Sequence, residues 1–251
     1  MINEHKNEET AVLLQEPTSI EIRKMQPSEL EVTIGWATDE GWNPGLNDAA
    51  TYYLADPEGF FVAVDRGRPV GACSAVAYGQ EFGFIGLFII ESEYRHGATA
   101  FLLLRRAMKH FEDRGVKNIG IDGVVHLREK YERLGFIAAH RNIRFQGCCD
   151  GKRSSGIVDL RLVPMERIEK FDRVYFPASR PEFLEHWIEQ QGAVSLGFVR
   201  SGKLHGYGVM RPCHIGWKIG PLFADSDGVA EMLFSAFAQQ SHGHPVTLDV
   251  P

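Results

Sequence analysis

The sequence predicts an α/β (α+β) fold in which a mixed, mostly antiparallel β-sheet is flanked by helices, and this unit occurs twice. Short β-type runs alternate with amphipathic helical runs along the whole chain, which is typical of such a layered fold. The run Phe82–Ile90 is almost wholly apolar, as expected for a strand buried on both faces. The element order of residues 18–147 recurs, more weakly, in residues 157–251.

Composition excludes several classes of protein. The chain has 251 residues, 44% hydrophobic and 24% charged, which is ordinary for a globular protein. A net charge of −6 argues against nucleic-acid and membrane-surface partners, which usually bind a basic patch. The four cysteines contain no CxxC pair, so we expect neither a disulfide framework nor a metal site, but reduced thiols.

The N-terminal residues 1–17 are polar and lack the apolar core of a secretory signal. No apolar run approaches the roughly 18 residues that a membrane helix needs. We therefore expect a cytoplasmic protein that begins with a disordered leader over residues 1–17.

The first copy opens with a strand at Ile20–Met25, where apolar residues alternate. A helix follows from Pro27 and stops near Gly41. Turn-forming residues make 41–45 a loop, and a second helix covers Asn47–Ala55.

Three strands come next, at Phe60–Val64, Val70–Ala77 and Phe82–Ile90. The first two flank Asp65–Pro69, which contains a glycine and suits a hairpin turn. The next helix is marked by apolar residues at helical spacing: Phe101, Leu104, Met108 and Phe111. It ends at Gly115.

The remaining elements of the first copy are a strand at Asn118–Asp122, a short helix near Leu127–Leu134, and strands around Phe136–Ala139 and Arg141–Phe145. Residues 148–156 are rich in Gly, Ser and charge and are expected to form a linker. The second copy stops at Pro251, where the first copy still has a helix and two strands to come. We expect its sheet to be either truncated or completed from elsewhere.

The start of the helix after Phe82–Ile90 is a candidate phosphate site. A helix N-terminus carries unpaired N–H groups and a partial positive charge. Arg95 and His96 add donors there, and the small residues Gly97, Ala98 and Ala100 allow close approach to the backbone. The alternative is an ordinary helix start after a loop.

Two motifs and the order of the predicted elements resemble the GNAT (Gcn5-related) N-acetyltransferase family. The pattern Tyr94-Arg95-x-x-Ala98-x-Ala100 is similar to the family's Arg/Gln-x-x-Gly-x-Gly/Ala pyrophosphate loop, and Tyr131-x-x-x-Gly135-Phe136 matches its Tyr-x-x-x-Gly-Phe signature. Segments that resemble bacterial members with a second, divergent GNAT-like domain are Glu40–Gly45, Phe82–Gly86 and Arg141–Arg144. The resemblance covers about residues 19–251 and implies the GNAT acyl-CoA N-acyltransferase fold, tandemly duplicated, with acetyl-CoA as co-substrate.

The resemblance also implies roles for particular residues. The main chain of Phe88, Ile89 and Ile90 would pair with the pantetheine arm. The pyrophosphate would be held by Arg95, His96, Gly97, Ala98, Thr99 and Ala100. The sequence departs from the family at Ala98, where the central glycine is expected, and this puts the affinity for CoA in question. The helix start at 224–228 in the second copy has two aspartates, which would repel a pyrophosphate, so we expect no CoA there.

By the same resemblance, Tyr131 would be the general acid that protonates the departing thiolate; the alternative is a core tyrosine before a turn. The general base is open. The candidates near loops or strand ends are Glu40, Glu81, Asp122 and His126, and a base acting through water needs none of them individually. His126 titrates near neutrality but could be a plain surface residue.

Trp42 and Asn43 lie in the loop that borders the acceptor site in GNAT folds, and they suit a small polar substrate with an apolar part. Trp42 could equally fill the core. The leading expectation is transfer of an acetyl group to a primary amine on a small molecule by direct attack, without metal or covalent intermediate. Alternatives are a non-catalytic acyl-CoA-binding module and a protein acetyltransferase. The second half would pack against the first or mediate a homodimer.

Overall fold

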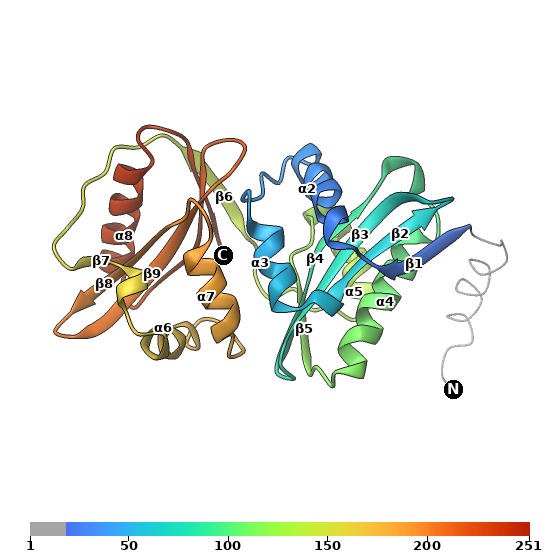
Figure 1. Ribbon diagram of the computed structural model, residues 1–251, viewed down its shortest axis with the longest axis horizontal. Coiled ribbons are helices and arrows are strands. Elements are labelled where there is room, and N and C mark those ends of the chain that lie inside the picture. The colour runs from blue at the N-terminus through green and yellow to red at the C-terminus, as the bar shows by residue number, and fades with distance from the viewer. Residues whose placement is uncertain (1–18) are drawn as a thin grey trace.

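The computed structural model describes residues 19–251, so the leader predicted for residues 1–17 lies outside the described residues. Two β-sheets stand side by side, each with its own helices (Figure 1). The first sheet has five strands in the order β1-β2-β3-β4-β5, and the second has six in the order β6-β11-β10-β9-β8-β7. This is the duplicated, mostly antiparallel architecture that the sequence predicts.

The first sheet is antiparallel except for its last pair, in which β4 and β5 run parallel. Its strands are β1 (Ile20–Lys24), β2 (Phe60–Asp65), β3 (Arg68–Tyr78), β4 (Phe82–Ile90) and β5 (Asn118–Ile121). Strands β2 and β3 are buried along almost their whole length, because helices cover both faces of the sheet.

Within residues 19–251, the first domain has four α-helices: α2 (Leu30–Asp39), α3 (Asp48–Ala55), α4 (Thr99–Asp113) and α5 (Arg128–Arg133). The long helix α4 packs on one face, where Leu103, Ala107 and Phe111 join the apolar residues of β2, β3 and β4. Contacts on the other face come from α2 and α3. The boundaries of α3 and α4 agree with the helical spacing in the sequence.

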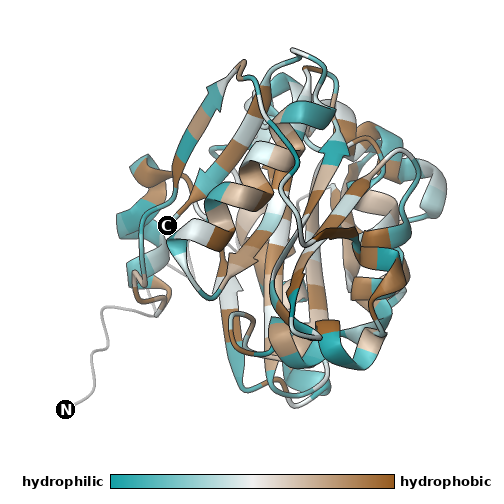
Figure 2. Cartoon of the chain, turned by 90° about the vertical axis from the view of Figure 1, so that its left-hand side faces the viewer, coloured by the Kyte–Doolittle hydropathy of each residue, from teal (hydrophilic) through white to brown (hydrophobic). Residues whose placement is uncertain are grey.

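The second domain repeats this plan. Its strands are β6 (Ile143–Gly147), β7 (Ile157–Asp159), β8 (Val194–Arg200), β9 (Lys203–Pro212), β10 (Trp217–Ala224) and β11 (Val246–Val250). Its helices are α6 (Met165–Asp172), α7 (Pro181–Glu189) and α8 (Asp227–Gln240). Helix α8 packs against β8, β9 and β10, as α4 does in the first domain. Figure 2 views this domain from its outer side and shows apolar and polar residues alternating along its helices and strands.

Strand β6 belongs to the second sheet. The sequence places it at the end of the first copy, but its residues pair antiparallel with β11, from Ile143 opposite Val250 to Gly147 opposite Val246. The second sheet is therefore completed from elsewhere, by a strand that crosses over from the first half. The strand predicted at Phe136–Ala139 is wrong, because residues 136–139 form no ladder with any described strand of either sheet.

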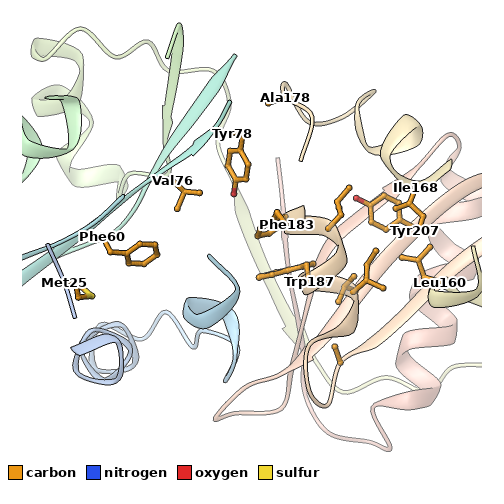
Figure 3. Close-up of a cluster of buried hydrophobic side chains, with 14 of the residues drawn as sticks. Met25, Phe60, Val76, Tyr78, Leu160, Ile168, Ala178, Phe183, Trp187 and Tyr207 are labelled. Carbon is orange, nitrogen blue, oxygen red and sulfur yellow. The ribbon is translucent and has the colours of Figure 1, made fainter. Parts of the chain in front are cut away.

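One apolar cluster joins the two domains (Figure 3). Phe60 and Tyr78 from the first sheet share it with Phe183 and Trp187 from α7. Tyr52 of α3 packs against both α7 aromatics, with ring centroids 5.2 Å apart in each case. Because aromatic side chains bury large apolar areas, this cluster holds the two sheets together as one unit.

Polar contacts reinforce the same interface. The Leu46 amide donates to the Pro212 carbonyl oxygen at 2.9 Å, and Gly45 forms an isolated β-bridge with Cys213. Asp48 at the start of α3 forms an ion pair with Arg211 of β9, and both side chains are largely buried. Within residues 19–251, no helix is long and apolar enough to cross a membrane.

Candidate active site

Strands β4 and β5 pair over only part of their length. The parallel ladder runs from Phe82 opposite Asn118 to Ile85 opposite Ile121, and β5 then ends. Strand β4 continues for five more residues, 86–90, without a partner on that side. Within residues 19–251, no strand pairs with 86–90 on the side away from β3, so an extended ligand could add there like a strand, although the Ile90 carbonyl oxygen already accepts a hydrogen bond from Arg95.

A β-bulge lies at the point where the two strands part. On β3, Ala72 and Ser74 are two residues apart, but their partners on β4, Ile89 and Gly86, are three apart. The extra residue falls at Leu87, which has a positive φ of 46°. Such a bulge re-aims the local backbone groups. It does so here at the closed end of the opening between β4 and β5.

The helix that follows β4 has free backbone donors at its start. The cap residue of α4 is Ala98, and no side chain caps the helix. Among residues 19–251, the amides of Ala98, Thr99, Ala100 and Phe101 have no acceptor, while the Ala98 carbonyl already accepts from Leu102. These four N–H groups and the helix dipole can bind an anion. Ala98 has an ordinary helical conformation (φ −74°), so this backbone does not require a glycine there.

Arg95 is directed away from the helix start. Its Nε donates to the Ile90 carbonyl oxygen at 2.8 Å, and its guanidinium forms an ion pair with Glu40 at the end of α2. Both residues line a groove of about 380 Å³ between α2 and the end of β4. The side chain of Arg95 thus fastens the phosphate loop to α2 and to β4. Gly97 and His96 are exposed in the same loop.

Tyr131 lies on the short helix α5, beside the end of β5. Its ring packs so closely on Gly123 that a Cβ added to that glycine would lie 2.8 Å from Cδ2. The Phe136 ring contacts the Tyr131 ring edge to face, with 6.2 Å between the ring centroids. The main-chain N–H of Phe136 donates to the Tyr131 carbonyl oxygen. Burial, with the neighbouring Cys73 thiol, raises the pKa of the Tyr131 phenol. The phenol therefore keeps its proton at neutral pH, as a general acid must.

Cys73 lies on β3 opposite the bulge and is fully buried. Burial raises the pKa of its thiol to about 12. A thiol with such a pKa is not a nucleophile near neutral pH. The exposed Cys148 and the half-buried Cys149 lie beyond β6.

The four base candidates are dispersed. Glu40 pairs with Arg95 near Ile90, where the opening between β4 and β5 is widest. The opening closes at Ile85, five residues or roughly 16 Å back along β4. Glu81 precedes β4, at the opposite end of that strand. Asp122 and His126 are exposed in the segment that joins β5 to α5 and therefore belong to the same stretch as Tyr131.

Trp42 and Asn43 lie at the interface between the domains. The side-chain amide of Asn43 donates to the main-chain carbonyl oxygen of Ile215 at 2.9 Å, and its Oδ1 accepts from the main-chain N–H of Ile215 at 3.2 Å. The Trp42 carbonyl accepts from Lys218 at 2.9 Å and from Arg144 at 3.3 Å. The loop between α2 and α3 thus rests on the second domain, and the Trp42 side chain is only half-buried.

A charged cluster beside Trp42 was missed by the sequence reasoning. Arg144 forms a bidentate pair with Asp249 at 2.7 and 2.9 Å, and Lys218 lies next to it. Burial, followed by the charge of Arg144, lowers the pKa of the Lys218 ammonium. In the sequence, Arg144 stood out only as part of the family-like segment Arg141–Arg144, and no pattern linked it to Lys218 or Asp249. What brings these residues together is the crossing of β6 into the second sheet.

The corresponding helix start in the second domain differs chemically. Helix α8 begins at Asp227, and Asp225 just before it hydrogen-bonds to His205 at 2.7 Å. Two carboxylates stand where the first domain offers only amides. Of the two helix starts, only that of α4 therefore offers free amides without carboxylates.

Comparisons with known proteins agree with this division. The model described as "Acetyltransferase (GNAT) family" matches residues 22–136, and "Acetyltransferase (GNAT) domain" matches residues 168–251. The chain is 27% identical over 245 residues to the holothin acyltransferase of Pseudoalteromonas sp. (strain SANK 73390). The aligned region covers 95% of this chain and 81% of that protein.

Solved structures show the same fold. A protein from Pyrococcus horikoshii described as "A Putative Acetyltransferase" superimposes with a TM-score of 0.75 at 24% identity, over 92% of this chain and 79% of its own. A GCN5-related N-acetyltransferase from Anabaena variabilis gives a TM-score of 0.58 at 13% identity, over 92% of this chain and 66% of its own. The two GNAT models together span most of the chain, which therefore belongs to the GNAT acetyltransferases and is a GNAT-type N-acyltransferase with a second GNAT-like domain at its C-terminal side.

Proposed function

We propose that this protein transfers an acetyl group from acetyl-CoA to a primary amine of a small molecule. The observation that carries the proposal is the open β4 edge at Phe88–Ile90, which runs between the free amides at the start of α4 and Tyr131 at its closed end. The diphosphate of the cofactor would meet the free amides at the start of α4, and its thioester would meet Tyr131.

The reaction needs two proton transfers. The amine nitrogen attacks the thioester carbonyl carbon, the new C–N bond forms, and the C–S bond then breaks. Tyr131 would donate its hydroxyl proton to the leaving sulfur, while the proton lost by the amine passes to a base or to water. The positive φ and extra residue at Leu87 support a role for the bulge in turning a backbone amide toward the carbonyl oxygen.

Among the base candidates, geometry favours His126 and Asp122, because they share a segment with Tyr131. Glu40 would instead contribute to the binding of acetyl-CoA, because it holds Arg95 in place. Arg95 belongs to the loop that would surround the pyrophosphate, which consists of Arg95, His96, Gly97, Ala98, Thr99 and Ala100. Trp42 and Asn43 would border the acceptor site from the domain interface, next to Lys218.

The proposal is tested by calorimetric titration with acetyl-CoA, followed by mass spectrometry of a panel of small primary amines. We expect binding in the micromolar range and acetylated product with stoichiometric release of CoA. A parallel series with propionyl-CoA and longer thioesters measures the preferred acyl chain. Absence of acetyl-CoA binding at millimolar concentration would contradict the proposed site, and turnover only with longer chains would replace acetyl by that acyl group.

A further inference from the structure

A groove of about 510 Å³ lies between the strand β1, at the other end of the first sheet, and the long helix α4. Its apolar lining residues come from both elements and are only half-buried. Three apolar and three cationic residues line the groove: Ile20, Ile22, Leu102, Arg105, Arg106 and Lys109. An apolar surface rimmed by charges of one sign is typical of a place where another segment binds.

The cations of this groove are incompletely neutralised. Arg105 is exposed, and its side chain forms no ion pair or hydrogen bond with any of residues 19–251. The guanidinium of Arg106 lies over the Phe61 ring, 4.3 Å from its centroid, and Lys109 pairs with Asp113 on its own helix. Among the described residues that line the groove there is no carboxylate, so the groove presents positive charge to a ligand.

The chain segment just before β1 has the complementary composition. Within residues 8–16, the apolar run Ala11–Leu14 is preceded by Glu8 and Glu9 and followed by Glu16. The segment contains these three carboxylates and no lysine or arginine. Its apolar run matches the half-buried apolar side chains of the groove, and its carboxylates match the cations.

Ser19 fixes the point at which the chain enters β1. Its hydroxyl donates to Asp65 at the end of β2, and the same carboxylate accepts from the Tyr94 hydroxyl at 2.9 Å. Tyr94 belongs to the loop that leads into α4. The chain that precedes Ser19 therefore starts beside the beginning of α4, the helix that forms one wall of the groove.

The segment is long enough to reach along the groove. Leu14 precedes Ile20 by six residues, which span up to roughly 20 Å when extended. The groove residues of α4, from Leu102 to Lys109, occupy only about 10 Å of helix. Pro17 lies between the apolar run and β1 and is a turn-forming residue, so the chain can reverse its direction there.

We propose that residues 8–16 of this same chain bind in the groove between β1 and α4. The run Ala11–Leu14 packs against the apolar residues of the groove, and Glu8 and Glu9 face Arg105. The contact is made by side chains, so the segment does not extend the sheet as another strand. It requires neither a bound cofactor nor a second chain.

NMR spectroscopy of the full chain tests this contact. Relaxation of the ¹⁵N nuclei of residues 11–14 reports how rigidly their backbone is held. We expect order parameters of about 0.8, close to those of a rigid backbone. We also expect nuclear Overhauser effects between the methyl groups of Leu13 or Leu14 and those of Ile20 or Ile22.

Charge reversal tests the pairing. Arg105→Glu should shift the equilibrium about fivefold toward the unbound segment, because like charges then face each other. The order parameters and the methyl signals should fall accordingly. The double change Glu8→Lys and Glu9→Lys should have the same effect without altering any residue of the groove. Combining it with Arg105→Glu should restore both signals. Lys170→Glu, an exposed change of the same sign on α6, is the matched control and should leave them unchanged.

Three results would overturn the proposal. The first is an order parameter below about 0.6 throughout residues 11–14 of the unmodified protein, which would mean a disordered leader. The second is an ordered segment that Arg105→Glu leaves unaffected, which would place it elsewhere. The third is methyl contacts between differently labelled chains in an equal mixture, because a second copy would then supply the segment. None of these readouts depends on acyl transfer.

Discussion

Arg95 donates a hydrogen bond from Nε to the carbonyl oxygen of Ile90 at 2.8 Å, which ties the loop before α4 to the last residue of β4. The same guanidinium pairs with Glu40, so a side chain that resembles a phosphate ligand in the sequence instead holds the loop in place. It acts on the geometry of the backbone amides that follow it.

Replacing Arg95 by Ala should raise the KM for acetyl-CoA roughly tenfold with a smaller effect on kcat, because the loop loses its two anchors and not a reacting group. Steady-state kinetics with varied acetyl-CoA measure this. Glu40→Gln should cause a smaller change in the same parameter and leave the pH profile of kcat unchanged. A displaced acidic limb in that profile would instead show that Glu40 is the base.

Tyr131→Phe should lower kcat by about 10²-fold or more while acetyl-CoA still binds, since only the proton donor is removed. Single-turnover measurements and calorimetry with the same preparation separate the two effects. The change deletes one hydroxyl from a half-buried ring, so thermal unfolding should be nearly unchanged. Full activity of the variant would remove Tyr131 from the mechanism.

The pH dependence follows from the raised pKa of Tyr131. In the proposed mechanism the active form is the neutral phenol, which is present below the pKa of Tyr131 and is lost as pH rises through that pKa. Because burial raises this pKa above the ordinary tyrosine value, kcat should not fall on the basic side until above about pH 10. A basic limb below pH 9 that persists in Tyr131→Phe would have to come from another group.

Gly123→Ala should displace Tyr131. An added Cβ would lie 2.8 Å from Cδ2 and 3.3 Å from Cζ of its ring, so the ring must move. A shift of about 1 Å in the hydroxyl should lower kcat by about tenfold to a hundredfold. Gly228→Ala is the matched control, because the space around that glycine is open, and it should retain activity.

The ion pair between the domains should be important for stability. Asp48→Ala would leave Arg211 without its counter-charge, and only 5% of the Arg211 side chain is exposed. Removing one partner of such a pair costs about 3–5 kcal/mol in the free energy of unfolding. Urea unfolding measures the loss. Asp39→Ala, at an exposed position on α2, should change the free energy by less than about 0.5 kcal/mol.

Much of the fold was readable from periodicity. The spacing of Phe101, Leu104, Met108 and Phe111 identified α4, although only Leu104 and Phe111 of this set are buried and the other two are exposed. The apolar run Phe82–Ile90 identified the strand that pairs on both sides over its first half. These signals are local, because a buried face repeats with the period of its own element. The motif around Tyr131 and Gly135 was equally local, and the chain does place Tyr131 on a helix beside the end of β5.

The sequence by itself thus determined most of the elements and their duplication, and it marked the start of α4 as a candidate anion site. Only the tertiary structure decided that β6 crosses to β11, that Arg95 binds Glu40 and Ile90, and that Arg144, Lys218 and Trp42 meet at the domain interface. The physical reason is the range of the interaction. Helix and strand preferences depend on neighbours within a few residues. The pairing of β6 with β11 and the Arg95–Glu40 ion pair join residues more than 50 positions apart, which no local pattern records.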